Sequence, residues 1–260
     1  MSALEADELV LLIDRKQRRY LIRLCEGSEF HTHSGIVPHD EIIGQQEGIE
    51  LRTAAGSVFQ IWRPTLSDYI LKMRRGAQVI YPKDIGAIVM YADIAPGMKI
   101  LETGIGSGAL SLALLRLGAN ITGYEISQEF ADRAQQNVAD FLGDDALSRY
   151  HIEIRDSYEG IDGTDFDRAI LDLPEPWQVV PYARDALVPG GIILAYTPSI
   201  TQASKFREAC QQHNFLAAET IEVLHRSWHI EGHAVRPDHR MVAHTGFLTK
   251  ARHATTGTKS

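Results

Sequence analysis

The hydrophobic and polar positions divide the chain into two unlike parts. Residues 1–65 contain short apolar, β-branched runs with no helical pattern between them, which is typical of β-strands. Residues 99–253 instead alternate such runs with segments whose apolar positions recur at helical spacing. The pattern therefore predicts a small N-terminal β domain, a helical linker over 66–98 and a larger α/β domain.

The second part has the strand–helix alternation of a parallel sheet that is covered on both faces, a Rossmann-like fold of the α/β class. The last two extended runs, 217–228 and 246–253, have no helix between them, so we expect an antiparallel strand at one edge. The polar segment 254–260 has nothing to bury and is expected to be disordered. The other expected strands are 99–105, 120–126, 151–156, 166–173 and 190–198, and the expected helices are 107–118, 129–143, 176–187 and 202–214.

Composition narrows the class of protein. The chain has 260 residues, a net charge of −8 and only two cysteines, Cys25 and Cys210, which excludes a disulfide-framed scaffold and a four-thiolate zinc site. Its first residues match neither a signal peptide nor a membrane span, so a cytoplasmic location is expected. Positive charge is concentrated in two segments, 60–83 and 220–253, which hold five Lys or Arg each against one and three acidic residues. A local surface that binds nucleic acid is therefore still compatible with the negative net charge. The alternative is that these segments form an ordinary solvated face.

A glycine-rich turn follows the first strand of the second part. Residues 102–108, Glu-Thr-Gly-Ile-Gly-Ser-Gly, allow backbone N–H groups to approach a ligand closely. The spacing is G-x-G-x-G rather than the G-x-G-x-x-G of dinucleotide-binding proteins. Glu102 could hold a cationic amino group, which S-adenosylmethionine carries and NAD lacks. Simple packing of the turn is the alternative.

Acidic residues end the next three strands. Glu125 lies about 20 residues past Gly104, where an acid binds both ribose hydroxyls or, alternatively, caps the next helix. Asp156 is expected near the adenine of a cofactor, with a turn cap as the alternative. Asp172 lies in Leu-Asp-Leu-Pro-Glu-Pro-Trp, where the prolines keep the chain extended and remove competing N–H donors. Plain turn chemistry is the alternative for this motif.

Together these motifs resemble the bacterial and archaeal tRNA (adenine-N1)-methyltransferases that modify adenosine 58 in the T loop. The family is S-adenosylmethionine-dependent and Rossmann-like, and the resemblance spans nearly the whole chain. Thr103 and Ile105 depart from many members, a change that leaves the backbone N–H groups of the loop in place. The matching segments are Glu29–His33, Gln78–Asp84, Leu101–Gly108, Tyr124–Glu125, Leu171–Asp172, Arg236–Pro237 and His244–Phe247.

The resemblance implies S-adenosylmethionine as methyl donor, tRNA as substrate, a homotetramer and no metal. It further implies that Gln78 and Tyr81 line the pocket for the cofactor and the target base. The cofactor-binding residues expected in this sequence are Gln78, Glu102, Gly104, Ile105, Gly106, Ser107, Gly108, Glu125, Asp156 and Asp172.

The chemistry of the implied reaction assigns roles to two residues. Adenine N1 already has a lone pair, so the enzyme must supply alignment and a favourable field rather than a base. We expect Asp172 to accept a hydrogen bond from the exocyclic amine as positive charge develops, and Tyr81 to position the ring or the methyl group. N1 is occluded in a folded T loop, so the nucleotide has to turn out into a pocket.

Two other classes of function remain open from the sequence. A methyltransferase that acts on a protein or a small molecule would share the cofactor residues without needing the basic segments. A nucleotide-binding module could be a nicotinamide enzyme or a non-catalytic subunit. The intact Glu102, Glu125 and Asp172 oppose a non-catalytic subunit, whereas titration with NAD and with S-adenosylhomocysteine would distinguish a nicotinamide enzyme.

Overall fold

The computed structural model describes residues 2–33, 35–76 and 78–255, which form two compact units, Met1–Met73 and Arg74–Ser260. The division falls inside the region 66–98, for which the sequence predicts a linker. Helix α1 (Leu66–Lys72) therefore belongs to the first unit and helix α2 (Pro82–Tyr91) to the second. Most of the tail expected to be disordered, residues 256–260, lies outside the described residues.

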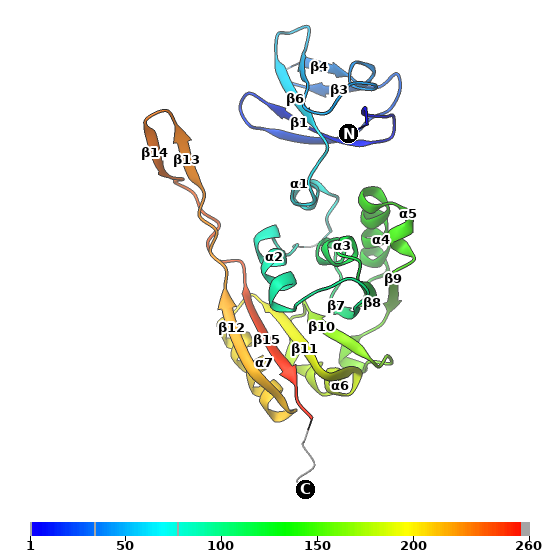
Figure 1. Ribbon diagram of the computed structural model, residues 1–260, viewed down its shortest axis with the longest axis vertical. Helices are drawn as coiled ribbons and strands as arrows, with labels where there is room; N and C mark the ends of the chain where they lie inside the picture. Colours follow the sequence, from blue (N-terminus) through cyan, green and yellow to red (C-terminus); the bar gives the residue numbers. More distant parts are fainter. Residues whose placement is uncertain (1, 34, 77, 256–260) are drawn as a thin grey trace. The chain divides into compact units, whose positions relative to one another are not determined.

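The first unit is built on a four-stranded antiparallel sheet with the order β2–β1–β6–β5 (Figure 1). Its buried core includes Leu12, Phe59 and Ile61. The short hairpin β3–β4 was not expected, because its strands have four residues each and mix exposed with half-buried positions. The elements before α1 are β1 (Leu9–Asp14), β2 (Arg19–Arg23), β3 (Glu29–Thr32), β4 (Gly35–Pro38), η1 (His39–Glu41), β5 (Glu50–Arg52) and β6 (Val58–Trp62).

The second unit contains a seven-stranded sheet with the order β12–β15–β11–β10–β7–β8–β9. Every strand and helix expected between residues 99 and 214 is present, with ends shifted by a few residues. The strands are β7 (Lys99–Thr103), β8 (Asn120–Glu125), β9 (Tyr150–Ile154), β10 (Phe166–Leu171), β11 (Leu187–Thr197), β12 (Phe215–Glu222), β13 (Trp228–Glu231), β14 (Ala234–Pro237) and β15 (Phe247–His253). The helices are α3 (Ala109–Arg116), α4 (Gln128–Leu142), α5 (Asp144–Leu147), η2 (Ser157–Glu159), η3 (Pro176–Gln178), α6 (Val180–Ala186) and α7 (Ile200–Gln212).

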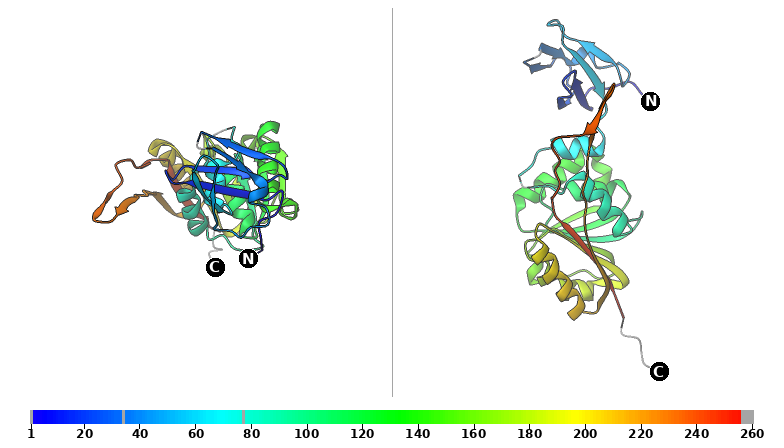
Figure 2. Two further views of the ribbon diagram at one scale, coloured as in Figure 1. Left: turned by 90° about the horizontal axis from the view of Figure 1, so that it is seen from above. Right: turned by 90° about the vertical axis from the view of Figure 1, so that its left-hand side faces the viewer.

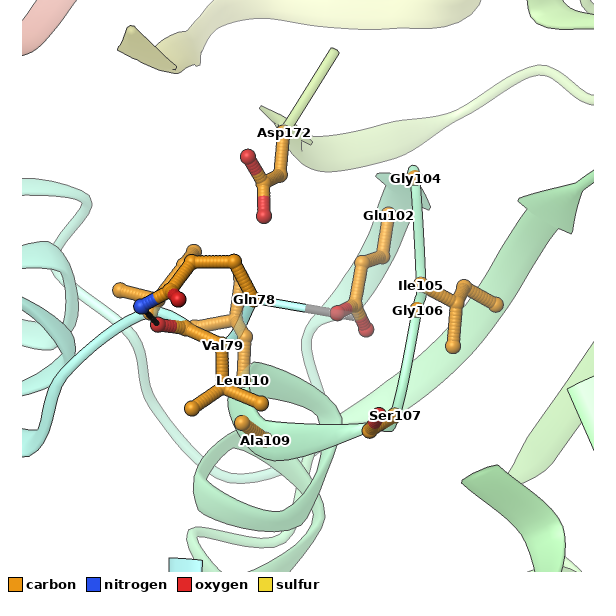
Figure 3. Close-up of a pocket in the computed structure, with 11 residues that line it drawn as sticks. Gln78, Val79, Glu102, Gly104, Ile105, Gly106, Ser107, Ala109, Leu110 and Asp172 are labelled. Carbon is orange, nitrogen blue, oxygen red and sulfur yellow. Dashed lines mark hydrogen bonds between the residues drawn. The ribbon is translucent and has the colours of Figure 1, made fainter. Parts of the chain in front are cut away.

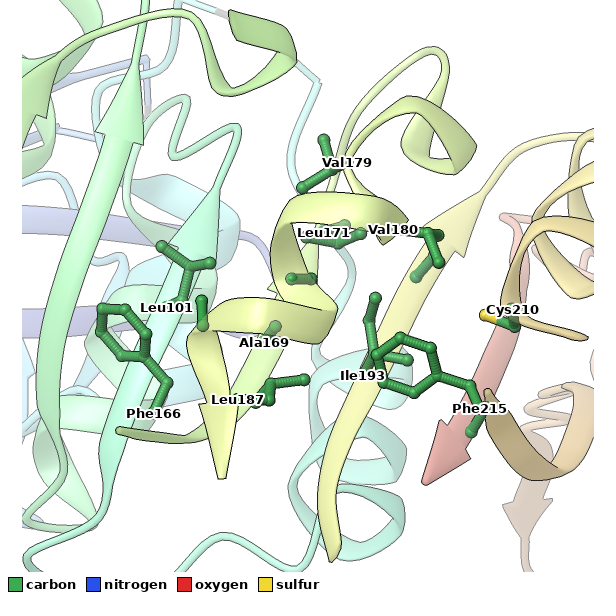
Figure 4. Close-up of a cluster of buried hydrophobic side chains, with 14 of the residues drawn as sticks. Leu101, Phe166, Ala169, Leu171, Val179, Val180, Leu187, Ile193, Cys210 and Phe215 are labelled. Atoms are coloured by element: carbon green, nitrogen blue, oxygen red, sulfur yellow. The ribbon is translucent and has the colours of Figure 1, made fainter. Parts of the chain in front are cut away.

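Helices cover both faces of this sheet, as the alternating pattern predicts. Figure 1 shows α2, α3 and α4 on one face and α6 and α7 on the other. The core under α6 and α7 brings Leu171 of β10 and Ile193 of β11 together with Val180 and Phe215 (Figure 4). Burial of such side chains supplies the main driving force for folding, at about 25 cal/mol per Å² of apolar surface. The packed layers hold the parallel strands in register, which fixes where their ends lie.

The antiparallel strand lies one place in from the edge. β15 pairs antiparallel with both β11 and β12, so β12 takes the edge position. The two last runs do pair with each other, as expected, but the single strand predicted over 217–228 is wrong beyond Glu222. The chain there leaves the sheet and forms the separate hairpin β13–β14, which turns at Gly232 with a φ of +55°. Figures 1 and 2 show this hairpin standing away from the sheet, and we call residues 223–246 the arm.

Candidate active site

The site begins at the carboxyl ends of the parallel strands. β7 pairs in parallel with both β8 and β10, so their ends meet at one edge of the sheet. Just past these ends, the backbone N–H of Asp172 donates to Thr103 O at 2.9 Å and that of Gly104 donates to Tyr124 O at 3.0 Å. The acidic residues that end separate strands are therefore brought to one place.

A small, partly open pocket lies at this edge of the sheet. Figure 3 shows the carboxyl groups of Glu102 and Asp172 pointing into the same space, with Gln78 across from them. Seven of the ten predicted cofactor residues line it. The lining residues are Gln78, Val79, Ile80, Glu102, Gly104, Ile105, Gly106, Ser107, Ala109, Leu110 and Asp172.

The glycine loop owes its shape to left-handed backbone. Gly104, Gly106 and Gly108 have φ values of +77°, +55° and +79°, a conformation that other L-residues rarely adopt. A Cβ atom at Gly104 would also overlap the backbone oxygen of Asp172, so the loop and Asp172 can approach only through glycine. A Cβ atom at Gly106 would meet no protein atom within 4 Å. The loop is thus packed on one side and open on the other.

Glu125 fastens this loop instead of lining the pocket. Its Oε2 accepts from the N–H of Gly106 at 3.0 Å, and its Oε1 accepts from the N–H of Ser127 at the start of α4, also at 3.0 Å. On the loop's other flank, the Asn137 side chain donates to Ser107 O at 2.9 Å. Both readings of Glu125 from the sequence, a site residue and a cap, are compatible with this geometry because the carboxylate bridges the loop and the helix.

The two carboxyl groups in the pocket differ in exposure, since Glu102 is buried and Asp172 is half-buried. Burial raises the pKa of Glu102 to about 8, and the nearby charge of Asp172 adds to the effect. Burial likewise raises the pKa of Asp172 to about 7. The Ser111 hydroxyl donates to Glu102 Oε2 at 2.8 Å, and the Tyr150 hydroxyl donates to Ser111 Oγ at 2.8 Å. A pair of acids with raised pKa values favours a cationic ligand.

Besides Glu125, three predicted residues lie outside the pocket lining. Asp156 accepts from the N–H of Tyr158 at 2.8 Å and so caps the 3-10 turn η2, which is the alternative that the sequence offered. Gly108 is the residue before α3, and Ala134 packs against it. Tyr81 is the residue before α2, and Pro82 occupies the first helical position.

Tyr196 was missed from the sequence. It lies near the end of β11, and its hydroxyl donates to Thr245 O at 2.6 Å. Burial, together with the nearby charges of Asp84, Asp172 and Tyr81, raises the pKa of Tyr196 to about 12. Its neighbours Asp172 and Tyr81 are the two predicted catalytic residues. The rule that placed Asp172, the carboxyl end of a parallel strand, would have found Tyr196 had it been applied to β11.

The residues present fit S-adenosylmethionine. Glu102 and Asp172 suit its cationic groups, and the open side of the glycine loop suits close approach of its polar atoms. Among residues 2–33, 35–76 and 78–255, no three His, Cys, Asp or Glu side chains are grouped so as to hold a metal ion.

Known proteins share both units of this chain. The family described as "tRNA methyltransferase complex GCD14 subunit" matches residues 58–236, and the one described as "TrmI-like N-terminal" matches residues 3–50. The tRNA (adenine(58)-N(1))-methyltransferase TrmI of Thermus thermophilus is 37% identical over 246 residues, 94% of this chain and 96% of that protein. The tRNA (adenine(57)-N(1)/adenine(58)-N(1))-methyltransferase of Methanocaldococcus jannaschii is 35% identical and is matched over 93% of this chain and 94% of its own length.

Solved structures agree with these relatives. A SAM-dependent O-methyltransferase from Thermotoga maritima has a TM-score of 0.93 and 32% identity, with 99% of this chain and 97% of that chain covered. The tRNA (m1A58) methyltransferase TrmI from Aquifex aeolicus has a TM-score of 0.86 and 28% identity, with 98% and 100% covered. The resemblance drawn from the motifs is thereby confirmed. The chain belongs to the family of the tRNA (adenine-58-N1)-methyltransferases.

Proposed function

We propose that this chain transfers the methyl group of S-adenosylmethionine to N1 of adenosine 58 in the T loop of tRNA. The observation that carries the proposal is the 37% identity to the Thermus thermophilus enzyme across 94% of the chain, which includes both compact units. Residues 99–253 then serve as the catalytic domain and residues 1–65 as a separate β domain.

In this proposal, some residues of the site bind the cofactor and others contact the target base. When bound, S-adenosylmethionine supplies a methyl group on a positively charged sulfur. Glu102 and the backbone of the 104–108 loop bind the cofactor, while Glu125 holds the loop in shape. Ionised Asp172 accepts a hydrogen bond from the exocyclic amine of adenine and stabilises the positive charge that appears on the purine. Tyr81 positions the base.

Mapping of methylated nucleosides by mass spectrometry, after reaction with an unmodified tRNA transcript, tests the proposal. We expect 1-methyladenosine at position 58 and none in a transcript with another base there. Methylation of proteins or small molecules in place of tRNA would instead support the alternative function, a methyltransferase with a different substrate. The similar structure from Thermotoga maritima is described as an O-methyltransferase, which is one such activity. An oxygen acceptor loses a proton on methylation, whereas adenine N1 does not.

Cofactor binding should release protons. Near pH 7 the two acids in the pocket, with pKa values of about 8 for Glu102 and about 7 for Asp172, are partly protonated, and a cationic ligand favours their ionised forms. We expect release of about one proton per cofactor at pH 7, and affinity that rises from about pH 6 to about pH 8, where the α-amino group of the cofactor begins to lose its own proton. Calorimetry in two buffers of different ionisation enthalpy measures the release. Glu102→Gln should reduce it, which separates the carboxyl proton from those of the ligand; equal release by both proteins would contradict the assignment.

Substrate binding should depend on salt through exposed cations. Lys83, counted among the basic residues of 60–83, is not available, because its side chain is only 9% exposed and bonds to protein groups. Arg63 is engaged by Glu8 and Glu47. The arm, by contrast, exposes three arginines. These are Arg226, Arg236 and Arg240.

We expect the KM for tRNA to rise about tenfold or more between 50 and 200 mM salt, because each phosphate contact releases condensed counterions. Each Arg→Ala change on the arm should lower the slope of that dependence by about 1. The affinity for S-adenosylhomocysteine, measured over the same range, is the control. A flat response of the KM would remove phosphate contacts from the proposal.

The proposal includes a homotetramer in the cytoplasm. Large apolar side chains on the arm, among them Trp228, Ile230 and Val235, are 56%, 72% and 58% exposed, which supports burial in an assembly. None of the helices in the described ranges is long and apolar enough to span a membrane. Native mass spectrometry of the full chain tests the tetramer, and a monomer at micromolar concentration would contradict it.

A further inference from the structure

Lys83, Asp84 and Thr245 form a closed cluster beside the candidate active site. The Lys83 ammonium donates to Asp84 Oδ1 at 2.8 Å, to Thr245 Oγ1 at 2.6 Å and to Val223 O at 2.6 Å. The Thr245 hydroxyl donates in turn to Asp84 Oδ2 at 2.6 Å. All three ammonium protons and both carboxylate oxygens thus have partners.

The cluster joins segments that are far apart in the sequence. Lys83 and Asp84 lie in the first turn of α2, Val223 is the first residue of the arm, and Thr245 lies at its other end. Both ends of the arm are therefore fastened to one turn of one helix. Asp84 is fully buried, and a buried charge is tolerated only when it is paired and hydrogen-bonded.

The same turn and the same threonine also bond to Tyr81 and Tyr196. The Tyr81 carbonyl accepts from the N–H groups of Asp84 and Ile85, at 2.9 and 3.0 Å. The Thr245 carbonyl accepts from the Tyr196 hydroxyl at 2.6 Å. Gly246 permits this approach, since a Cβ atom there would lie 2.5 Å from Cζ of the Tyr196 ring.

We propose that Lys83, Asp84 and Thr245 are positioning residues for methyl transfer, which tie the base of the arm to the turn that carries Tyr81 and to Tyr196. The inference rests on the proposed function for its kinetic consequences. Within the described residues, no hydrogen bond joins the side chains of this cluster to a residue that lines the cofactor pocket. It therefore acts on the target base and leaves cofactor binding alone.

Thr245→Val tests the inference, because it keeps the shape of the side chain and removes one acceptor from Lys83 and one donor from Asp84. We expect kcat for tRNA methylation to fall about tenfold, with affinity for S-adenosylhomocysteine within twofold of wild type. Thr245→Ser, which restores the hydroxyl, should recover most of the rate. Hydrogen exchange should speed up in peptides covering 81–92 and 240–248 and stay unchanged in 99–125.

Thr249→Val is the matched control, because it removes another buried hydroxyl of the same region, one that bonds to Thr220 at 3.0 Å. Its rate should stay within twofold of wild type. Wild-type kcat and exchange in Thr245→Val, or an equal loss in Thr249→Val, would overturn the positioning role even if the wild-type protein methylates tRNA. Failure of the wild-type protein to methylate tRNA would reject the proposed function separately, and the exchange experiment would still decide whether the cluster holds the arm.

Discussion

Asp172→Asn is expected to lower kcat for tRNA methylation by about 100-fold or more while the protein keeps its fold. The amide has the same shape but carries no negative charge, so it loses the stabilisation of charge that develops on the purine, which is worth roughly 10²–10³ in rate for a preorganised group. Single-turnover methylation with saturating tRNA measures the effect. S-adenosylhomocysteine affinity should change far less, because Glu102 and the loop still line the pocket.

The same variant is expected to be more stable than wild type without ligand at pH 8. Burial raises the pKa of Asp172 to about 7 from an ordinary 3.8, so the folded state binds this proton more tightly than the unfolded state does. Wild-type stability therefore falls as pH rises from about 4 to about 7 and is level above, while Asn removes this cost. We expect a gain of about 1–2 kcal/mol at pH 8, less than the three pKa units imply, because the pocket admits solvent.

Asp167→Asn is the control for both results. Asp167 lies on the same strand at its opposite end, where its carboxylate accepts from the N–H of Lys99 at 2.8 Å. This variant should keep its turnover and gain no stability at pH 8. A rate for Asp172→Asn within threefold of wild type would show that Asp172 does not stabilise the methylated base.

The sheet and most of the pocket could be predicted because local patterns carried the information. Apolar runs separated by helices require a parallel sheet, and parallel strands bring their carboxyl ends to one edge. That rule, together with the glycine-rich turn that contains Glu102, predicts that Glu102 and Asp172 lie in one site, although they are far apart in sequence. It placed Asp156 less well, since its carboxylate is used by the turn that follows β9.

The arm could not be predicted in the same way. Its two strands have four residues each, and nearly every position is exposed or half-buried, so alternation of polar and apolar residues reflects no core. Gly232 was the one local signal for a turn there. A continuous strand through 217–228 was therefore predicted where the chain leaves the sheet.

The burial of Lys83 could not be predicted from the sequence for a different reason. A lysine after Tyr-Pro looks like a surface cation, and its burial depends on Val223 and Thr245, which follow about 140 and 160 residues later. No periodicity reports such a contact. Only the resemblance to a family connects the motifs around Lys83 and Thr245 at the level of sequence. The structure supplies the physical reason that they occur together, because one buried ion pair needs both.

Gly104→Ala is expected to abolish measurable cofactor binding and to destabilise the protein by about 3 kcal/mol. The left-handed conformation, with φ at +77°, costs roughly 1–2 kcal/mol for a residue with a Cβ atom. The overlap with the backbone oxygen of Asp172 adds to this, because that oxygen is rigid backbone and cannot rotate away. Any relaxation must separate the loop from Asp172, which are the two walls of the pocket.

Gly97→Ala separates the cost of the left-handed backbone from the cost of the overlap with Asp172. Gly97 also has a positive φ, +81°, but a Cβ atom there meets nothing within 4 Å. It should lose only the conformational part, about 1 kcal/mol, and bind S-adenosylhomocysteine as wild type does. Thermal melts and calorimetric titration of the two variants in parallel give the comparison. If Gly104→Ala melts at the same temperature as Gly97→Ala and binds S-adenosylhomocysteine as wild type does, the loop and Asp172 do not need to touch. The assignment of these two segments as the walls of the cofactor pocket would then be wrong.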